Sequence, residues 1–403
     1  MKYIVMLGDG MADYPIEALG GKTPLEMAKK PNIDRLARHG HLGMVKTVPD
    51  GMKPGSDVAN LAAMGYNPVN CYTGRSPLEA VSIGIQMADT DVAFRCNLVT
   101  LSDEAEYGEK TMMDYSSGEI TTAEAAQLIQ AVNEAFRTDE LLFYPGISYR
   151  HCMIWHNGPT GLYLTPPHDI SDRKITEYLP KNPVILDLMS RSYEVLKDHP
   201  VNQARKTRGL NPANSIWLWG EGTRPAISRF EEIYGVKGSV ISAVDLIKGI
   251  GICAGMKVIE VEGATGNIDT NFKGKGEAAL KTLLDGQDLV YIHVEAPDEC
   301  GHHGDLKGKI RSIELIDQEI VGPLLEGLEK AGEDYSILVM PDHPTPIAIK
   351  THVADPIPYV LYRSTQETDS GIDTYTEETA KATGNYEEHG YELMRQLLNP
   401  GKA

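Results

Sequence analysis

Runs of apolar residues without polar alternation recur along the chain, most of them in its second half. They lie at residues 3–7, 215–219, 257–261, 288–294, 335–340 and 357–362. Such runs are typical of central strands that are covered on both faces. Between them, apolar residues recur at three-to-four spacing over residues 243–253, 276–284 and 309–328, which predicts helices. Strands that alternate with helices indicate an α/β fold with a mainly parallel sheet flanked by helices.

The middle of the chain, residues 89–214, has a looser pattern. Proline and polar loops multiply at 145–146, 157–159, 165–167 and 180–183, although a helix is predicted over 122–137 and a strand over 149–155. We interpret this segment as a smaller α+β domain inserted into a core domain. The core would then consist of residues 1–88 and 215–403.

The charge of the chain restricts its partners. Among 403 residues, 38 Lys and Arg stand against 57 Asp and Glu, a formal net charge of −19, which disfavours nucleic acid and anionic membranes. A small anionic substrate remains compatible, because metal ions or a local basic cluster can reverse the field in one cleft. The five cysteines form no C-x-x-C pair, and the apolar run near Met1 is too short for a signal sequence or a membrane span. We therefore expect a soluble, cytoplasmic protein with a small-molecule partner.

Asp and His residues lie just beyond three of the predicted strands, at the carboxyl ends where sites form in parallel sheets. The group comprises Asp9 after the run 3–7, Asp298, His302 and His303 after 288–294, Asp342 and His343 after 335–340, and His352 a few residues later. Carboxylate oxygen together with imidazole nitrogen suits Mn²⁺ or Zn²⁺. The set is large enough to hold two ions.

Each of these residues also has a structural interpretation. Asp9 in a Gly-Asp-Gly turn can close an Asx-turn, Asp298 can cap the following helix, and a lone His is more often a hydrogen-bonded structural residue than a ligand. Three strand ends that each carry Asp, two of them with His nearby, nevertheless favour a shared cation, because uncompensated buried charges are costly.

Ser56 follows Pro54-Gly55 and precedes a helix predicted over 58–64. A serine at this place is a good N-cap, which is a purely structural role. A hydroxyl at a helix N-terminus beside a metal ion can also be an activated nucleophile for an anionic electrophile. The two interpretations are compatible.

Several motifs together resemble a known family. GDGMAD, GGKTPLEMAKKPNIDRLARHG, PGSDVANLAAMGYNP, YTGRSPLEA, AGMKVIEVEGATGNIDTN, APDECGHHGD and PDHPTP look like the archaeal-type, cofactor-independent phosphoglycerate mutases of the alkaline phosphatase superfamily. The resemblance implies an alkaline-phosphatase-like core that holds two divalent metal ions, manganese first with Zn²⁺ or Co²⁺ as alternatives. It further implies that Ser56 is the nucleophile that is phosphorylated. The ligands implied are Asp298, His302 and His352 for one metal, and Asp9, Asp342, His343 and Ser56 for the other.

The resemblance implies interconversion of 3-phosphoglycerate and 2-phosphoglycerate through phosphoserine, a step of glycolysis and gluconeogenesis. Two segments depart from the archaeal pattern: RHCMIWHNGPTGLYLTPPHD, and MPDHPTPIAIKTHVADPIPYV, which looks more like a bacterial branch proposed to phosphorylate homoserine. A homoserine phosphotransferase of threonine biosynthesis and a phosphatase of the same superfamily are therefore alternatives. No ATP-binding G-x-x-x-x-G-K-[ST] motif supports a kinase, since Gly21-Lys22-Thr23 has Ile16 where the upstream Gly would stand.

A phosphoglycerate pocket needs cations beyond the metals, because the substrate carries a carboxylate and a phosphate. Candidates in or near the inserted segment are Arg75, Arg95, Arg150, His151 and Arg173, with Lys174 beside them. The alternative for each is a solvated surface position or an ion pair.

Overall fold

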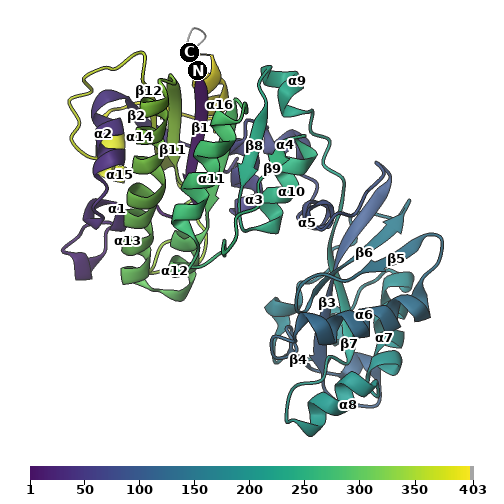
Figure 1. Cartoon of the computed structure of the whole chain (residues 1–403). Coiled ribbons are helices and arrows are strands. Elements are labelled where there is room, and N and C mark those ends of the chain that lie inside the picture. Colours follow the sequence, from purple (N-terminus) through teal and green to yellow (C-terminus); the bar gives the residue numbers. More distant parts are fainter. Residues whose placement is uncertain (400–403) are drawn as a thin grey trace. The chain divides into compact units, whose positions relative to one another are not determined.

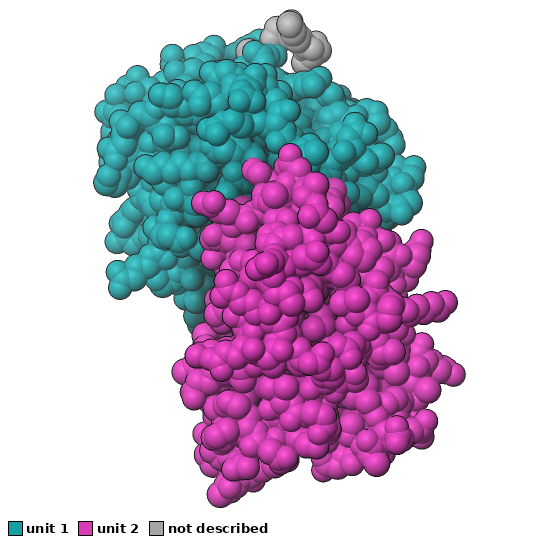
Figure 2. All heavy atoms as spheres, turned by 90° about the vertical axis from the view of Figure 1, so that its right-hand side faces the viewer, with its two compact units in different colours: residues 1–72, 226–403 teal, residues 73–225 magenta. Residues whose placement is uncertain are grey.

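The computed structural model describes residues 1–399 and divides the chain into two compact units, coloured separately in Figure 2. Unit 1 is formed by Met1–Tyr72 and the chain from Ala226 onward, and unit 2 is Thr73–Pro225. Unit 2 is longer at both ends than the 89–214 segment expected from the sequence. The reason is packing: α5 (Ser76–Ser82) packs on β3 (Asp91–Leu101) and on β7 (Ser215–Thr223), so both flanks belong to the smaller unit.

Unit 1 is built on an eight-stranded sheet in the order β13-β2-β12-β11-β1-β10-β8-β9. The strands are β1 (Lys2–Gly8), β2 (His41–Val45), β8 (Gly238–Ile241), β9 (Lys257–Val258), β10 (Leu289–Val294), β11 (Tyr335–Met340), β12 (Ile357–Arg363) and β13 (Tyr386–Glu387). The run from β11 to β9 is parallel throughout, whereas β12 is antiparallel to both β11 and β2. The predicted α/β fold with a mainly parallel sheet is confirmed.

Helices cover both faces of this sheet (Figure 1). On one face, Ile4 and Met6 of β1 join a buried cluster with α2, α11, α13, η5 and α14, while on the other face Tyr291 of β10 contacts α3 and Val240 of β8 contacts α10. The helices of unit 1 are η1 (Glu17–Leu19), α1 (Pro24–Met27), α2 (Pro31–His39), α3 (Ser56–Ala63), α4 (Pro68–Cys71), α9 (Phe230–Tyr234), α10 (Asp245–Cys253), α11 (Phe272–Leu284), α12 (Ala296–His303), α13 (Leu306–Leu315), the π-helical η5 (Ile316–Val321), α14 (Gly322–Ala331), α15 (Glu377–Ala382) and α16 (Glu392–Leu398). No helix within residues 1–399 has the length and apolar character needed to cross a membrane.

Unit 2 has a five-stranded antiparallel sheet with its own core. β3 pairs with β7, with β6 (Arg150–His156) and with β4 (Met112–Asp114), and β6 pairs with β5 (Leu141–Tyr144). Its remaining helices are η2 (Tyr107–Glu109), α6 (Thr122–Phe136), η3 (Pro167–Ile170), η4 (Thr176–Tyr178), α7 (Pro183–Leu196) and α8 (Pro200–Thr207).

The structure corrects one strand assignment. The run 215–219 was expected in the large parallel sheet, but it forms part of β7, which is antiparallel to β3 in unit 2. Ile216, Trp217 and Leu218 are buried in the core of unit 2, where β7 also packs on α7. An apolar run predicts a buried strand without specifying which sheet it joins.

Candidate functional site

The register of three neighbouring strands brings the predicted ligands to one edge of the large sheet. In β1, Gly8 aligns with Val294 of β10, and Leu7 aligns with Met340 of β11. Because these strands are parallel, the segments that follow them begin side by side at their carboxyl ends. Asp9 comes directly after β1, and Asp342 comes two residues after β11.

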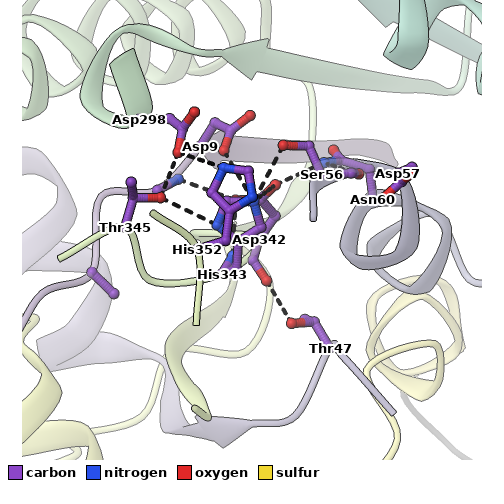
Figure 3. Close-up of polar contacts among 12 residues, drawn as sticks. Asp9, Thr47, Ser56, Asp57, Asn60, Asp298, Asp342, His343, Thr345 and His352 are labelled. Carbon is purple, nitrogen blue, oxygen red and sulfur yellow. Dashed lines mark hydrogen bonds and ion pairs between the residues drawn. The ribbon is translucent and has the colours of Figure 1, made fainter. Parts of the chain in front are cut away.

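One group of potential ligands surrounds Asp9 and is fully buried (Figure 3). His343 Nε2 lies 3.3 Å from Asp342 Oδ2 and 3.7 Å from Asp9 Oδ1. Asp9 Oδ1 has no hydrogen-bond partner in the structure, although Asp9 is only 1% exposed. Burial, reinforced by the carboxylates of Asp342 and Asp298, raises the pKa of Asp9 well above its ordinary value.

The second group is centred on Asp298, at the start of α12. His302 Nε2 lies 3.2 Å from Asp298 Oδ2, His352 Nε2 lies 3.3 Å from Asp298 Oδ1, and the two imidazole Nε2 atoms are 2.9 Å apart. The pKa of His302 rises to about 9, chiefly through its hydrogen bond to Asp298. His302 Nδ1 lies 3.0 Å from the carbonyl oxygen of Lys350, which can only accept, so this nitrogen carries a hydrogen. Nε2 is therefore the atom that could coordinate an ion.

Ser56, the first residue of α3, lies beside the first group of potential ligands. The helix α3 begins at Ser56, its N-cap is Gly55, and no side-chain capping hydrogen bond is present there. Instead, Ser56 Oγ lies 3.2 Å from His343 Nε2. The structure therefore does not support the N-cap interpretation of this hydroxyl, which points to the buried His and Asp residues (Figure 3).

Several buried partners of these residues were not predicted from the sequence. His293 Nε2 lies 2.9 Å from Asp9 Oδ2, and its Nδ1 lies 3.1 Å from Ser242 Oγ. Burial lowers the pKa of His293 to about 3, so the ring is neutral. With Asp9 ionised, Nε2 must donate, and Nδ1 then accepts from the Ser242 hydroxyl. The only sequence signal for His293 is a polar residue within an otherwise apolar strand.

Asn60 is a second such partner, at 0% exposure. Its Nδ2 donates to the Ser56 carbonyl oxygen at 2.8 Å and to Asp342 Oδ2 at 2.9 Å, while its Oδ1 accepts from the Tyr291 hydroxyl. This amide fixes the start of α3 relative to Asp342. The hydroxyl of Thr47 adds a bond to the Asp342 carbonyl oxygen.

The donor set fits divalent cations. Potential ligand atoms lie within 4.8 Å of one another in three overlapping groups: Asp9, Asp342 and His343; Asp298, His343 and His352; and Asp9, Glu295 and Asp298. His302 joins them through Nε2, 3.2 Å from Asp298 Oδ2. The buried Asp9 Oδ1, which has no hydrogen-bond partner, is a group that a cation would satisfy. His303 stands apart from the set, because its side chain is 76% exposed and lies 3.7 Å from Glu299.

The candidate substrate-binding residues all lie in unit 2, and the structure brings two of them together. Arg95 donates to both oxygens of Glu79, at 2.6 and 2.7 Å, and its guanidinium lies 4.5 Å from the ring centroid of Trp219. Arg75 shares the same carboxylate at 2.9 Å. Although burial opposes it, the two guanidinium groups lower the pKa of Glu79. Glu79 and Trp219 were not anticipated from the sequence.

The other candidates differ from one another in their surroundings. Arg150 is exposed, and its guanidinium lies 4.8 Å from the ring centroid of Tyr149. Arg173 donates to the Tyr178 hydroxyl at 3.3 Å, and Lys174 pairs with Glu109 at 2.9 Å, both at exposed positions.

His151 is buried, and its Nε2 has no hydrogen-bond partner in the structure. It is 5% exposed, its Nδ1 accepts from the Gly146 N–H at 2.9 Å, and burial lowers its pKa to about 3. The ring is therefore neutral near pH 7 and supplies no positive charge.

Comparisons with known proteins identify the family of this chain. Residues 37–202 match the family model described as 2,3-bisphosphoglycerate-independent phosphoglycerate mutase. A relative of that name from Methanothrix thermoacetophila is 50% identical over 401 residues, covering 99% of this chain and 100% of its own.

Two solved structures share the fold along the whole chain. A Pyrococcus horikoshii protein has a TM-score of 0.83 and 29% identity, covering 99% of this chain and 96% of its own. The cofactor-independent phosphoglycerate mutase of Thermoplasma acidophilum has a TM-score of 0.67 and 25% identity, covering 99% and 100%. The chain therefore belongs to the 2,3-bisphosphoglycerate-independent phosphoglycerate mutase family.

Proposed function

We propose that the protein interconverts 3-phosphoglycerate and 2-phosphoglycerate by a metal-dependent phosphotransfer through phosphoserine at Ser56. The observation that carries the proposal is the position of Ser56 Oγ, 3.2 Å from His343 Nε2 and at the first residue of α3, beside the buried carboxylates. Family membership supplies the substrate, because relatives at about 50% identity bear the name of this mutase.

Two divalent cations, manganese first, would be held by the two ligand groups. Asp298, His302 and His352 would bind one, while Asp9, Asp342 and His343 together with Ser56 would bind the other. When bound, such ions supply Lewis acidity, which eases deprotonation of the serine hydroxyl and neutralises charge on the phosphate.

The phosphoryl transfer itself would take place at Ser56. Ser56 Oγ forms a bond to phosphorus as the bond from phosphorus to the C3 oxygen of the substrate breaks, and the hydroxyl proton passes to that oxygen. Glycerate then turns, and its C2 hydroxyl takes the phosphoryl group back while Ser56 regains a proton. Backbone N–H groups at the start of α3 favour the negative charge of phosphoserine.

Unit 2 would contribute to binding of the anionic substrate. The cluster of Arg75, Arg95, Glu79 and Trp219 carries two guanidinium groups against one carboxylate, so it keeps a net positive charge. Arginine suits a carboxylate or phosphate through paired hydrogen bonds. We expect Arg95→Met and Arg150→Met to raise KM for phosphoglycerate about tenfold.

The decisive experiment assays the manganese-loaded protein and its Ser56→Ala variant for conversion of 3-phosphoglycerate to 2-phosphoglycerate. Wild type should turn over and Ser56→Ala should not, while acid-quenched wild type should carry phosphate on Ser56 by mass spectrometry. Ser239→Ala, which removes a buried hydroxyl bonded to Gln287 elsewhere in unit 1, is the matched control and should retain activity. Wild-type turnover by Ser56→Ala would overturn the role of this serine. Phosphorylation of homoserine with 3-phosphoglycerate inert would overturn the substrate.

A further inference from the structure

Thr345 lies between the two ligand groups and contacts a member of each (Figure 3). Its hydroxyl donates a hydrogen bond to Asp298 Oδ1, and Thr345 Oγ1 lies 3.3 Å from His343 Nδ1. We propose that Thr345 is a positioning residue that couples the two metal-ligand groups through one directed chain of hydrogen bonds, from His343 through Thr345 to Asp298. The inference rests on the proposed function, in that it takes these two residues as ligands of different cations.

The direction of the chain follows from donor and acceptor chemistry. An ionised carboxylate only accepts, so the single hydroxyl hydrogen of Thr345 is committed to Asp298. The contact with His343 can then form only if Nδ1 carries the hydrogen and the threonine oxygen accepts it. His343 is thereby held in the tautomer whose lone pair is on Nε2, the atom that lies near Ser56, Asp342 and Asp9. One hydroxyl thus selects the coordinating nitrogen of one group and orients a carboxylate oxygen of the other.

Two glycines pack closely against Thr345 where its hydroxyl meets Asp298. Gly10 has a φ of +61°, and a Cβ at that position would lie 2.5 Å from Thr345 Oγ1 and 2.7 Å from Asp298 Oδ1. Gly301 approaches from another side, where a Cβ would lie 2.8 Å from Thr345 Cγ2. Two glycines therefore leave room for the threonine and for its bond to the carboxylate.

The backbone of Thr345 is fixed as well. Lys309 Nζ, at 0% exposure, donates to the carbonyl oxygen of Thr345 at 2.8 Å, to that of Ala12 at 3.1 Å and to Asp13 Oδ2 at 2.7 Å. Three partners use the three hydrogens of the ammonium group. Lys309 thus ties the segment after β11 to the segment after β1, which carries Asp9.

If Thr345 only filled space, metal affinity would depend on the shape of its side chain and not on its hydroxyl. Thr345→Val, which keeps the shape and removes the hydroxyl, is therefore the main test. Binding of Mn²⁺ to metal-free protein is followed through the EPR signal of the free ion, which counts ions bound per chain and their affinities. We expect Thr345→Val to lower the affinity for both ions about 10- to 100-fold, which is the usual effect of losing an outer hydrogen-bond partner of a metal ligand. Thr345→Ser keeps the hydroxyl, and its affinity for each ion should stay within about threefold of wild type.

Two matched variants separate coupling from general damage. Ser242→Ala removes the hydroxyl bonded to His293, whose Nε2 lies 2.9 Å from Asp9 Oδ2. This variant should weaken the binding of only one ion, the one proposed for the Asp9 group. Thr100→Val removes a buried hydroxyl that bonds the Pro212 carbonyl oxygen in unit 2 and should weaken neither. The proposed coupling of the two ligand groups by Thr345 would be overturned if Thr345→Val bound both ions with wild-type affinity. It would also be overturned if the affinity for only one ion fell.

A second readout uses the wild-type protein without metal, so the result depends neither on the folding of Thr345→Val nor on activity. In metal-free wild type, ¹⁵N-histidine NMR should find one ring, assigned by its loss in His343→Gln, as the Nδ1–H tautomer. Finding the Nε2–H tautomer there would overturn the chain of hydrogen bonds. Failure of the proposed function would look different: Ser56→Ala would be active while the tautomer and the paired loss of metal affinity persisted.

Discussion

Two buried polar side chains, Arg205 in unit 2 and Asp9 in unit 1, differ in how completely their hydrogen-bonding capacity is used. In unit 2, Arg205 is 2% exposed and donates to the carbonyl oxygens of Asn211 and Ser117 and to Glu124, while both ends of the Asn202 amide are bonded to backbone. In unit 1, Asp9 is also buried but keeps an oxygen without a partner, and burial together with nearby carboxylates raises its pKa. Saturated polar groups are structural, whereas an unsatisfied group among like charges marks a place for a ligand of opposite charge.

The largest expected effect comes from Asp9→Asn. Removing a proposed ligand should lower mutase turnover at least about 1000-fold, roughly 4 kcal/mol in the barrier. The same change should raise the melting temperature of the metal-free protein, because it removes a buried charge that lies near other carboxylates and has one oxygen without a hydrogen-bond partner. Activity assays with added Mn²⁺ and thermal melting in chelator check the two parts. A lower melting temperature in chelator would show that the buried Asp9 carboxylate stabilises the metal-free protein.

The opposite behaviour is expected for Arg205→Ala in unit 2. Truncation leaves the carbonyl oxygens of Ser117 and Asn211 without their donor, so the free energy of unfolding should fall by about 3 kcal/mol. Urea titration followed by hydrogen exchange in unit 2 measures the loss. Lys174→Ala breaks an exposed pair with Glu109 and should change stability by less than about 1 kcal/mol. An equally small loss for Arg205→Ala would show that this network contributes little.

The sequence predicted most strands of unit 1 and the Asp and His residues that follow them, but it did not predict every element correctly. Apolar runs predicted β1, β10, β11 and β12, and the Asp and His residues beyond them were expected to share one edge. The helix predicted over 309–328 is instead α13, the π-helical η5 and α14, since three-to-four spacing does not distinguish a π-turn from a regular one. The run 215–219 was assigned to the wrong sheet, because pairing partners are not encoded in local periodicity.

The outer partners of the site were missed for another reason. Thr345, Asn60 and Lys309 are single polar residues in segments whose local pattern is that of any buried loop or helix. Their importance arises from hydrogen bonds that span up to 297 positions in the chain, as between Lys309 and Ala12. Such contacts follow from the register of the strands, which the sequence alone does not fix.

Metal binding should stabilise one unit and not the other. At a free Mn²⁺ concentration about 100 times the dissociation constant, each bound ion should add about 2.7 kcal/mol to the stability of unit 1. Hydrogen exchange resolved by peptide should show slower exchange in β1, β10 and β11 and unchanged exchange in β3 and β7. Chelator should reverse the effect. Equal slowing in both units, or none in either, would contradict the assignment of the ligands to unit 1.

The smallest expected effect is a pH dependence that belongs to unit 2. Burial lowers the pKa of His151 to about 3, whereas the unfolded chain titrates near 6.5. Between these values the unfolded state binds the extra proton, so stability falls as the pH drops below about 6.5, by up to about 1.4 kcal/mol per pH unit. His151→Gln keeps an acceptor for the Gly146 N–H and removes the titration, so the slope between pH 6 and 4.5 should decrease by about one proton. The slope should be the same with Mn²⁺ and with chelator, because His151 lies in unit 2 and the proposed ligands all lie in unit 1. A slope that changed with metal would show that protonation in unit 2 is coupled to metal binding in unit 1.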